Sequence, residues 1–148
     1  MASGAHGLIV VGVDGSDASK AALGWALDEA SLRDAKVHAV HAWEFPGLAV
    51  MAYGPTAVPV ITPEDLEKAA HDVLEAAVAE VAGAHPTAAL TTSVQRGHPA
   101  EVLLEAAKGA DLLVVGSRGR GGFSGMLLGS VSTQVAHHAS CPVLIVRG

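Results

Sequence analysis

The residues best suited to chemistry lie in a glycine-rich segment at positions 116–130. Arg118, Arg120 and Ser130 stand in it beside six glycines: Gly116, Gly119, Gly121, Gly122, Gly125 and Gly129. Glycine permits positive backbone φ and lets an anion approach the main chain without meeting a Cβ atom. N–H groups along such a turn, and those that open a following helix, form an anion site. The segment therefore predicts a phosphate-binding loop with two cations and a hydroxyl beside it.

A flexible turn that happens to be rich in glycine is the alternative, since glycine motifs alone are not specific. Three features favour the phosphate loop. The segment follows an apolar run typical of a buried strand, it precedes a helical pattern, and it brings arginines into an otherwise acidic chain.

Short apolar runs alternate with amphipathic segments along the chain, which predicts strands alternating with helices. Ser16 or Asp17 is expected to cap the first helix, and Thr62 with Asp65 predicts a capping box for the second. Strands are expected at 8–13, 37–42, 88–94, 111–116 and 143–146, and helices at 17–33, 63–82, 100–108 and 130–139. The stretch 43–61, rich in proline and glycine, is expected to be a lid or a contact surface.

Each of the first two helices has one apolar face. The expected buried residues are Leu23, Ala26, Leu27 and Ala30 in the first, and Leu66, Ala70, Val73, Ala77 and Val81 in the second. This alternation predicts a single α/β domain, residues 1–148: an open, Rossmann-like, five-stranded parallel sheet, order 3-2-1-4-5, with helices on both faces. Such sheets bind ligands beyond the carboxyl ends of their strands, which here are Asp14, Ala42, Gly97 and Gly116.

Composition narrows the class of protein. Nine Lys and Arg against fifteen Asp and Glu give a formal charge of −6, which argues against nucleic acid or an anionic membrane as a partner. The single cysteine, Cys141, precludes an intrachain disulfide and reads as a small buried residue. Met1–Gly7 lacks a signal-peptide pattern and no apolar run is long enough to span a membrane, so a cytoplasmic protein is expected.

Other reactive side chains form weaker patterns. His38 and His41 fall on opposite faces of a strand, and His137 and His138 point apart on a helix, so neither pair predicts a metal site. His98 is the one histidine at a strand exit. No Gly-x-Ser-x-Gly elbow accompanies the serines, which argues against a hydrolase triad. Trp25 and Trp43 are expected to be packing residues.

With these elements in place, the chain resembles the universal stress proteins. Gly116-x-x-Gly119, nine residues and then Gly129-Ser130 match the ATP-binding signature of that family without a gap. The resemblance covers nearly the whole chain, through Val11-Gly12-Val13-Asp14-Gly15-Ser16, Val40-His41-Ala42, Gly97-x-Pro99 and the ending Cys141-Pro142-Val143-Leu144-Ile145-Val146. It implies a fold of the adenine nucleotide alpha hydrolase-like kind.

The resemblance also implies residue roles. Asp14 and the backbone near Gly12 and Val13 would lie beside adenine and ribose, and Ala42 would contact adenine through its backbone. The ribose would be bordered by Val115 and Gly116, and the phosphates held by Gly119, Gly129, Ser130 and Val131, with Arg118 adjacent. The cofactor would be ATP, with ADP or AMP as alternatives, and Mg²⁺ would bridge phosphate oxygens. Asp14 could also be an ordinary turn or helix-capping residue, as Asp at a strand exit often is. The ligand role is favoured because the glycine loop should lie close to Asp14 in a parallel sheet.

Two function classes remain open. One is a nucleotide-dependent sensor or regulatory module of the stress response, with an unidentified protein partner and at most slow hydrolysis. The other is an ATP-using enzyme, a slow ATPase or a phosphotransferase. The absence of Gly-Lys-Ser/Thr, the P-loop lysine motif, favours the first class. The uncharged last strand, an edge in order 3-2-1-4-5, predicts a homodimer, as the resemblance also implies.

Overall fold

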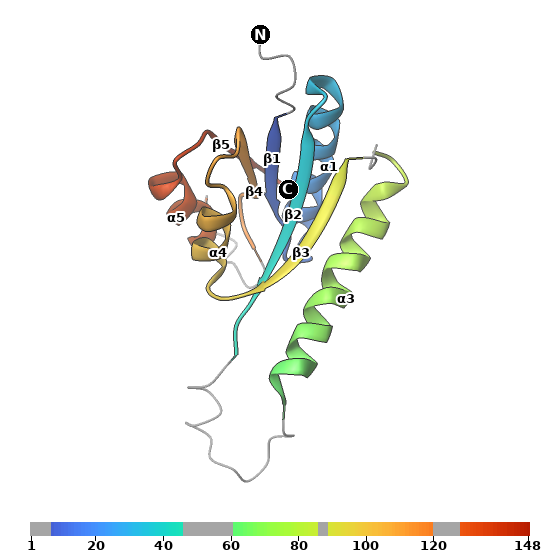
Figure 1. The fold of residues 1–148 in the computed structure, drawn as a ribbon, viewed down its shortest axis with the longest axis vertical. Helices are drawn as coiled ribbons and strands as arrows, with labels where there is room; N and C mark the ends of the chain where they lie inside the picture. The colour runs from blue at the N-terminus through green and yellow to red at the C-terminus, as the bar shows by residue number, and fades with distance from the viewer. Residues whose placement is uncertain (1–6, 46–60, 86–88, 120–127) are drawn as a thin grey trace.

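The computed structural model describes residues 7–45, 61–85, 89–119 and 128–148, and structural statements below concern these ranges. Five strands alternate with four helices (Figure 1). The strands are β1 (Leu8–Gly12), β2 (Lys36–Trp43), β3 (Leu90–Arg96), β4 (Leu112–Gly116) and β5 (Val143–Val146). The helices are α1 (Asp17–Arg33), α3 (Pro63–Ala82), α4 (Pro99–Ala106) and α5 (Ser130–His138).

The strands form one parallel sheet in the order β3-β2-β1-β4-β5, which confirms the predicted fold class. Val10 is paired with His38 of β2 on one side and with Leu113 of β4 on the other. The winding direction reverses between β1 and β4. Their carboxyl ends therefore diverge into connections on opposite faces, which opens a crevice between them.

Helices cover both faces of the sheet, with α1 and α3 on one side and α4 and α5 on the other (Figure 1). Neighbouring β1 residues point to opposite faces: Ile9 and Val11 pack under α1 and α3, while Val10 packs with Leu103 of α4 and Val135 of α5. Both cores consist of aliphatic side chains and alanines, which let helices approach the sheet closely.

Helix starts agree with the sequence predictions. Ser16 caps α1, where its Oγ accepts from the Ser19 N–H at 3.2 Å. Thr62 and Asp65 form the expected capping box of α3, with Pro63 as its first residue. The four predicted core residues of α1 are all buried: Leu23, Ala26, Leu27 and Ala30.

The expected bounds of β1, β2, β4 and α5 are off by one residue at one or both ends, and three further predictions were wrong in detail. On α3, Leu74 is buried with Ala70, Ala77 and Val81, while Leu66 and Val73 are half-buried. The β3 strand begins and ends two residues later than expected, because its pairing with β2 continues to Trp43 and Arg96. The α4 helix begins one residue earlier and ends two residues earlier than expected, with Pro99 as its first residue and Ala107 as its C-cap.

The described helices are each too short or too polar to cross a membrane. Most of the stretch 43–61, and with it the expected lid or contact surface, lies outside the described residues, as do Arg120 and the middle of the glycine-rich segment.

Candidate functional site

A cavity of about 360 Å³ lies at the carboxyl ends of β1, β2 and β4, where the sheet's winding reverses. Its walls come from five places in the sequence: the turn after β1, the end of β2, the start of α4, the exit of β4 and the start of α5. The volume is within the range of small-molecule sites in proteins.

All eleven residues predicted from the sequence line this one cavity: Gly12, Val13, Asp14, Ala42, Val115, Gly116, Arg118, Gly119, Gly129, Ser130 and Val131. Their contact with a nucleotide stays a prediction. The sequence reasoning missed seven further lining residues: Ser16, Ser19, Val40, His41, Pro99, Leu103 and Ser132.

One wall of the cavity is apolar. It is built from Val40 of β2, Leu103 of α4 and Val115 of β4, all of them buried, together with Pro99 and Val131. Aliphatic side chains of this kind suit the faces of a flat, weakly polar ring. Other lining residues carry hydroxyls, a carboxylate and a guanidinium, so the cavity is suited to a ligand that has both apolar and polar parts.

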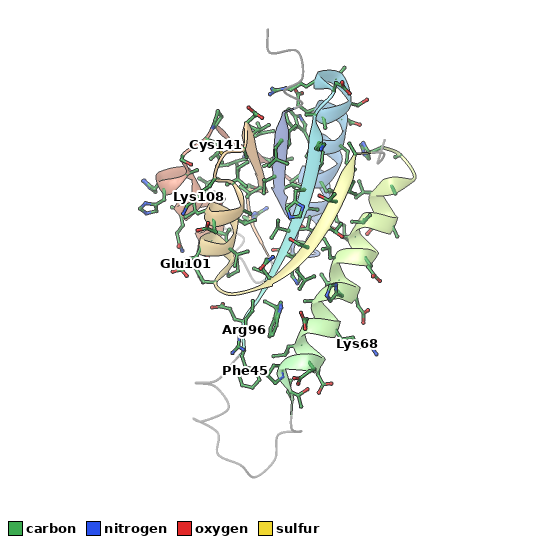
Figure 2. The ribbon with its side chains drawn as sticks, viewed as in Figure 1. Phe45, Lys68, Arg96, Glu101, Lys108 and Cys141 are labelled. Carbon is green, nitrogen blue, oxygen red and sulfur yellow. The ribbon has the colours of Figure 1, made fainter. Side chains whose placement is uncertain are left out.

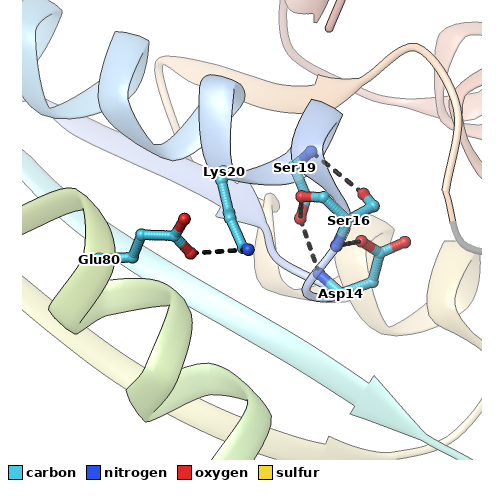
Figure 3. A network of polar contacts seen from close by, with 5 residues as sticks. All are labelled: Asp14, Ser16, Ser19, Lys20 and Glu80. Carbon is cyan, nitrogen blue, oxygen red and sulfur yellow. Dashed lines mark hydrogen bonds and ion pairs between the residues drawn. The ribbon is translucent and has the colours of Figure 1, made fainter.

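The turn after β1 is held by a closed set of hydrogen bonds (Figure 3). Asp14 Oδ1 accepts from the Ser16 N–H at 2.8 Å, and the Asp14 N–H donates to Ser19 Oγ at 3.2 Å. Ser19 Oγ in turn donates to the Ser16 carbonyl at 3.0 Å. Gly15 takes φ +86°, in the region that favours glycine, which allows the chain to turn back here. The turn therefore fixes both the backbone and the carboxylate of Asp14.

Close approach, and not positive φ, explains the glycines at positions 116 and 119. Gly116, Gly119 and Gly129 all lie outside the positive-φ region, which corrects that part of the sequence prediction. A Cβ atom on Gly116 would lie 2.7 Å from the backbone of Ala18, and one on Gly119 would lie 2.6 Å from Asp14 Oδ2. The loop thus packs directly on the turn after β1.

The start of α5 offers backbone donors to the cavity. Its cap residue Gly129 has no side chain to bond the first turn. Within the described ranges, the N–H groups of Ser130 and Val131 have no acceptor. The Gly129 N–H, in contrast, donates to the Ser117 carbonyl at 2.6 Å, so this expected anion donor is already used inside the protein. The backbone donors that α5 offers to an anion therefore begin at Ser130.

Two of the missed residues are buried serines at equivalent places. Ser19 is the third residue of α1 and Ser132 is the third residue of α5, and their exposed fractions are 5% and 2%. Each hydroxyl bonds one backbone group soon after the preceding strand and the carbonyl of the residue that caps its own helix. The position of a serine three residues after a cap is the sequence signal that could have identified them.

His41 is the remaining polar residue that was missed. Its Nδ1 lies 2.7 Å from the Val13 carbonyl oxygen. A carbonyl can only accept, so Nδ1 is the donor in this hydrogen bond. His41 thereby ties the end of β2 to the turn after β1, which no pattern in the sequence indicated.

The other histidines and the cysteine considered from the sequence lie outside the cavity or contact neighbouring parts of the fold. His38 bonds Thr91 and Ser93 across the sheet, and burial lowers its pKa. Burial and the nearby Asp111 charge raise the pKa of the Cys141 thiol, which is half-buried and not fully buried as expected. No three histidine, cysteine or carboxylate side chains come together in the described part of the chain. His98 lies outside the cavity, 3.8 Å from Glu44.

Aromatic residues near the ends of β2 and β3 contact an arginine. The Arg96 guanidinium carbon lies 5.7 Å from the Trp43 ring centroid and 6.0 Å from that of Phe45, and Figure 2 shows Arg96 beside Phe45. Such a distance is typical of a cation–π contact. Neither aromatic residue lines the cavity.

The fold and the cavity define an α/β protein with a cavity at the switch point of a parallel sheet. The model of the universal stress protein family matches residues 7–147, and the chain belongs to that family.

Individual universal stress proteins are also similar to this chain in sequence. A universal stress protein of Mycolicibacterium smegmatis is 43% identical over 139 residues, which cover 94% of this chain and 45% of the relative. Universal stress protein Rv2623 of Mycobacterium tuberculosis is 40% identical over 145 residues, with coverage of 94% and 44%. The chain thus spans less than half the length of these relatives.

Solved structures of similar length share the fold. A universal stress protein crystallised in complex with cAMP is 34% identical, with a TM-score of 0.60 and coverage of 97% of this chain and 98% of that one. UspA of Lactobacillus plantarum is 25% identical, with a TM-score of 0.66 and coverage of 96% and 98%.

Proposed function

We propose that this protein binds an adenine nucleotide in the cavity between β1 and β4, and that ATP is the ligand. The observation that carries the proposal is that one cavity combines apolar lining residues with N–H groups at the start of α5 that have no acceptor among the described residues. The slot between Val40, Leu103 and Val115 suits the adenine ring, and the N–H groups of Ser130 and Val131 suit phosphate oxygens. The similarity to a universal stress protein in complex with cAMP supports the adenine nucleotide class.

In this proposal, Asp14, Gly12 and Val13 lie beside the nucleoside, and Ala42 contacts adenine through its backbone. The phosphates lie against Gly119, Gly129, Ser130 and Val131, with Arg118 supplying a positive charge. Among the described lining residues Asp14 is the only carboxylate, so a Mg²⁺ ion brought with ATP would be held mainly by phosphate oxygens. The protein then works as a nucleotide-dependent regulatory module, in which occupancy of the cavity sets the state that a partner recognises.

The direct test identifies the nucleotide that copurifies with the protein and then measures affinities for ATP, ADP and AMP by calorimetry. We expect an adenine nucleotide in the denatured supernatant. We expect Asp14→Ala to weaken ATP binding by about tenfold, since it removes a charged hydrogen-bonding group worth roughly 1.5–3 kcal/mol. Unchanged ATP affinity in this variant would mean that Asp14 only forms the turn after β1. Absence of nucleotide binding by the wild type would refute the proposal.

We further propose a homodimer formed by pairing of two β5 strands. β5 is an edge of the sheet, and its residues Val143–Val146 carry no charge, whereas the other edge, β3, exposes Thr92, Gln95 and Arg96. The Pro142 carbonyl accepts from Leu113 of β4 and the Val146 carbonyl accepts from Ser117, just after β4. The alternate residues of β5 therefore direct their N–H and C=O groups outward. An uncharged strand with outward backbone groups favours pairing with a second copy.

The matched pair Ile145→Pro and Ile145→Ala tests the dimer. Both substitutions shorten the half-buried side chain, but only proline removes the outward N–H group that the second strand would bond. We expect dimers for the wild type and for Ile145→Ala, and monomers for Ile145→Pro, by light scattering at micromolar concentration. A dimer that survives Ile145→Pro in a folded protein would place the interface elsewhere.

A further inference from the structure

We infer that Ser132 is a positioning residue that aims backbone N–H groups of two separate segments at the phosphates of the ligand. The inference rests on the nucleotide-binding function proposed above. Ser132 was not singled out by the glycine signature; it lines the cavity, and its hydroxyl bonds two peptides of the cavity wall.

The Ser132 hydroxyl lies between two carbonyl groups that are twelve residues apart in the sequence. Its Oγ is 3.0 Å from the carbonyl oxygen of Ser117, just after β4, and 3.1 Å from that of Gly129, at the start of α5. The hydroxyl has one proton to share between two acceptors, so it forms a three-centre bond. Because the side chain is 2% exposed, water cannot replace this bond.

Holding a carbonyl fixes the N–H on the other side of the same peptide. A trans peptide is planar, and its C=O and N–H bonds point in opposite directions. The Ser117 carbonyl belongs to the peptide that carries the Arg118 N–H, and the Gly129 carbonyl belongs to the peptide that carries the Ser130 N–H. With both carbonyls turned toward Ser132, these two N–H groups point away from it, and both Arg118 and Ser130 line the cavity.

The orientation of these two peptides matters because, if they could rotate, either the C=O or the N–H group of each could face the ligand. A carbonyl oxygen turned toward a phosphate would repel it, whereas an N–H donates to it. Each carbonyl also has a backbone donor, from Gly129 N–H to Ser117 and from Thr133 N–H to Gly129. Ser132 is the described side chain that ties the two peptides to each other, and so sets the spacing between their donors.

Ser19 occupies the equivalent position on the other side of the cavity and provides a contrast. Its hydroxyl bonds the Asp14 N–H and the Ser16 carbonyl, in the turn assigned above to the nucleoside end of the ligand. Loss of Ser19 should therefore affect ligands with and without phosphate alike. Loss of Ser132 should affect only ligands that carry phosphate.

The experiment compares affinities for adenosine, AMP and ATP in the wild type, Ser132→Ala, Ser19→Ala and Thr133→Val, with adenosine measured by ligand-observed NMR at millimolar concentration. Thr133→Val is the matched control, because it also removes a hydroxyl from the Gly129 carbonyl, at 2.8 Å, but does not reach Ser117. We expect Ser132→Ala to weaken AMP and ATP binding by at least about tenfold and to leave adenosine within about twofold. Thr133→Val should match the wild type for all three ligands.

Backbone amide NMR supplies a second readout. In the wild type, AMP should move the Arg118 and Ser130 amide proton signals downfield, and in Ser132→Ala this shift should be reduced even at saturating AMP. Equal losses for adenosine and ATP in Ser132→Ala would mean a merely structural role and would overturn the inference. A wild type that binds none of the three ligands would instead refute the proposed function.

Discussion

Gly119→Val is expected to weaken ATP binding by about 100-fold or more, equivalent to about 2.7 kcal/mol, while the protein stays folded. A Cβ atom at this position would lie 2.6 Å from Asp14 Oδ2. The short Asp14 side chain can move aside, so the fold tolerates the change, but the carboxylate then leaves the place that the Ser16 N–H gives it. The valine methyls would also occupy the surface on which the phosphates are proposed to lie.

Gly83→Val is the matched control for this variant. Gly83 ends α3 with helical backbone angles, φ −67° and ψ −21°, and a Cβ atom there would have nothing within 4 Å. Calorimetry with ATP and a thermal melt should be run on both variants. The prediction requires lost binding and a retained cooperative melt for Gly119→Val, with both retained for Gly83→Val. A folded Gly119→Val protein with wild-type ATP affinity would exclude the glycine loop from the site.

ATP turnover is expected to be far below the roughly 10 per second of a median enzyme. Fast hydrolysis needs a residue that orients the attacking water and charges fixed at the transferring phosphoryl group. The described residues that line the cavity include no Lys, Glu or Gln. Asp14 accepts from the Ser16 N–H and is assigned to the nucleoside end, and His41 has its Nδ1 committed to the Val13 carbonyl. Binding needs only backbone donors and a few charges, so bound ATP should persist.

A single-turnover assay with Mg²⁺ and labelled ATP tests this expectation on protein freed of contaminating ATPases. Gly129→Val serves as the site-specific control, because a Cβ atom there would make only ordinary contacts, the nearest at 3.4 Å to Arg118 Cα, while obstructing the start of α5. Hydrolysis at several per second that disappears in Gly129→Val would show that the protein is an enzyme. Hydrolysis that is unchanged in this variant would come from a contaminant.

The glycine signature and the periodicity of the apolar residues predicted most of the fold and the location of the site. Alternation of apolar runs and amphipathic segments determined the parallel sheet, because short buried strands joined by helices have few other arrangements. Thr62, Pro63 and Asp65 determined where α3 begins, since capping is a local interaction. The strand exits and the glycine-rich segment indicated where a site would lie, and the resemblance to the universal stress proteins implied the individual residues that line one cavity.

Tertiary structure decided what depends on contacts between distant segments. The burial of Leu74 in place of Val73 follows from how α3 lies on the sheet, which a helical repeat does not specify. The need for glycine at 116 and 119 comes from Ala18 and Asp14, about a hundred residues away, and not from the local backbone angle. The roles of His41 and Ser132 in the cavity also depend on contacts between distant segments. Their hydrogen-bond partners, Val13 and Ser117, are brought to them only by the parallel packing of β1, β2 and β4.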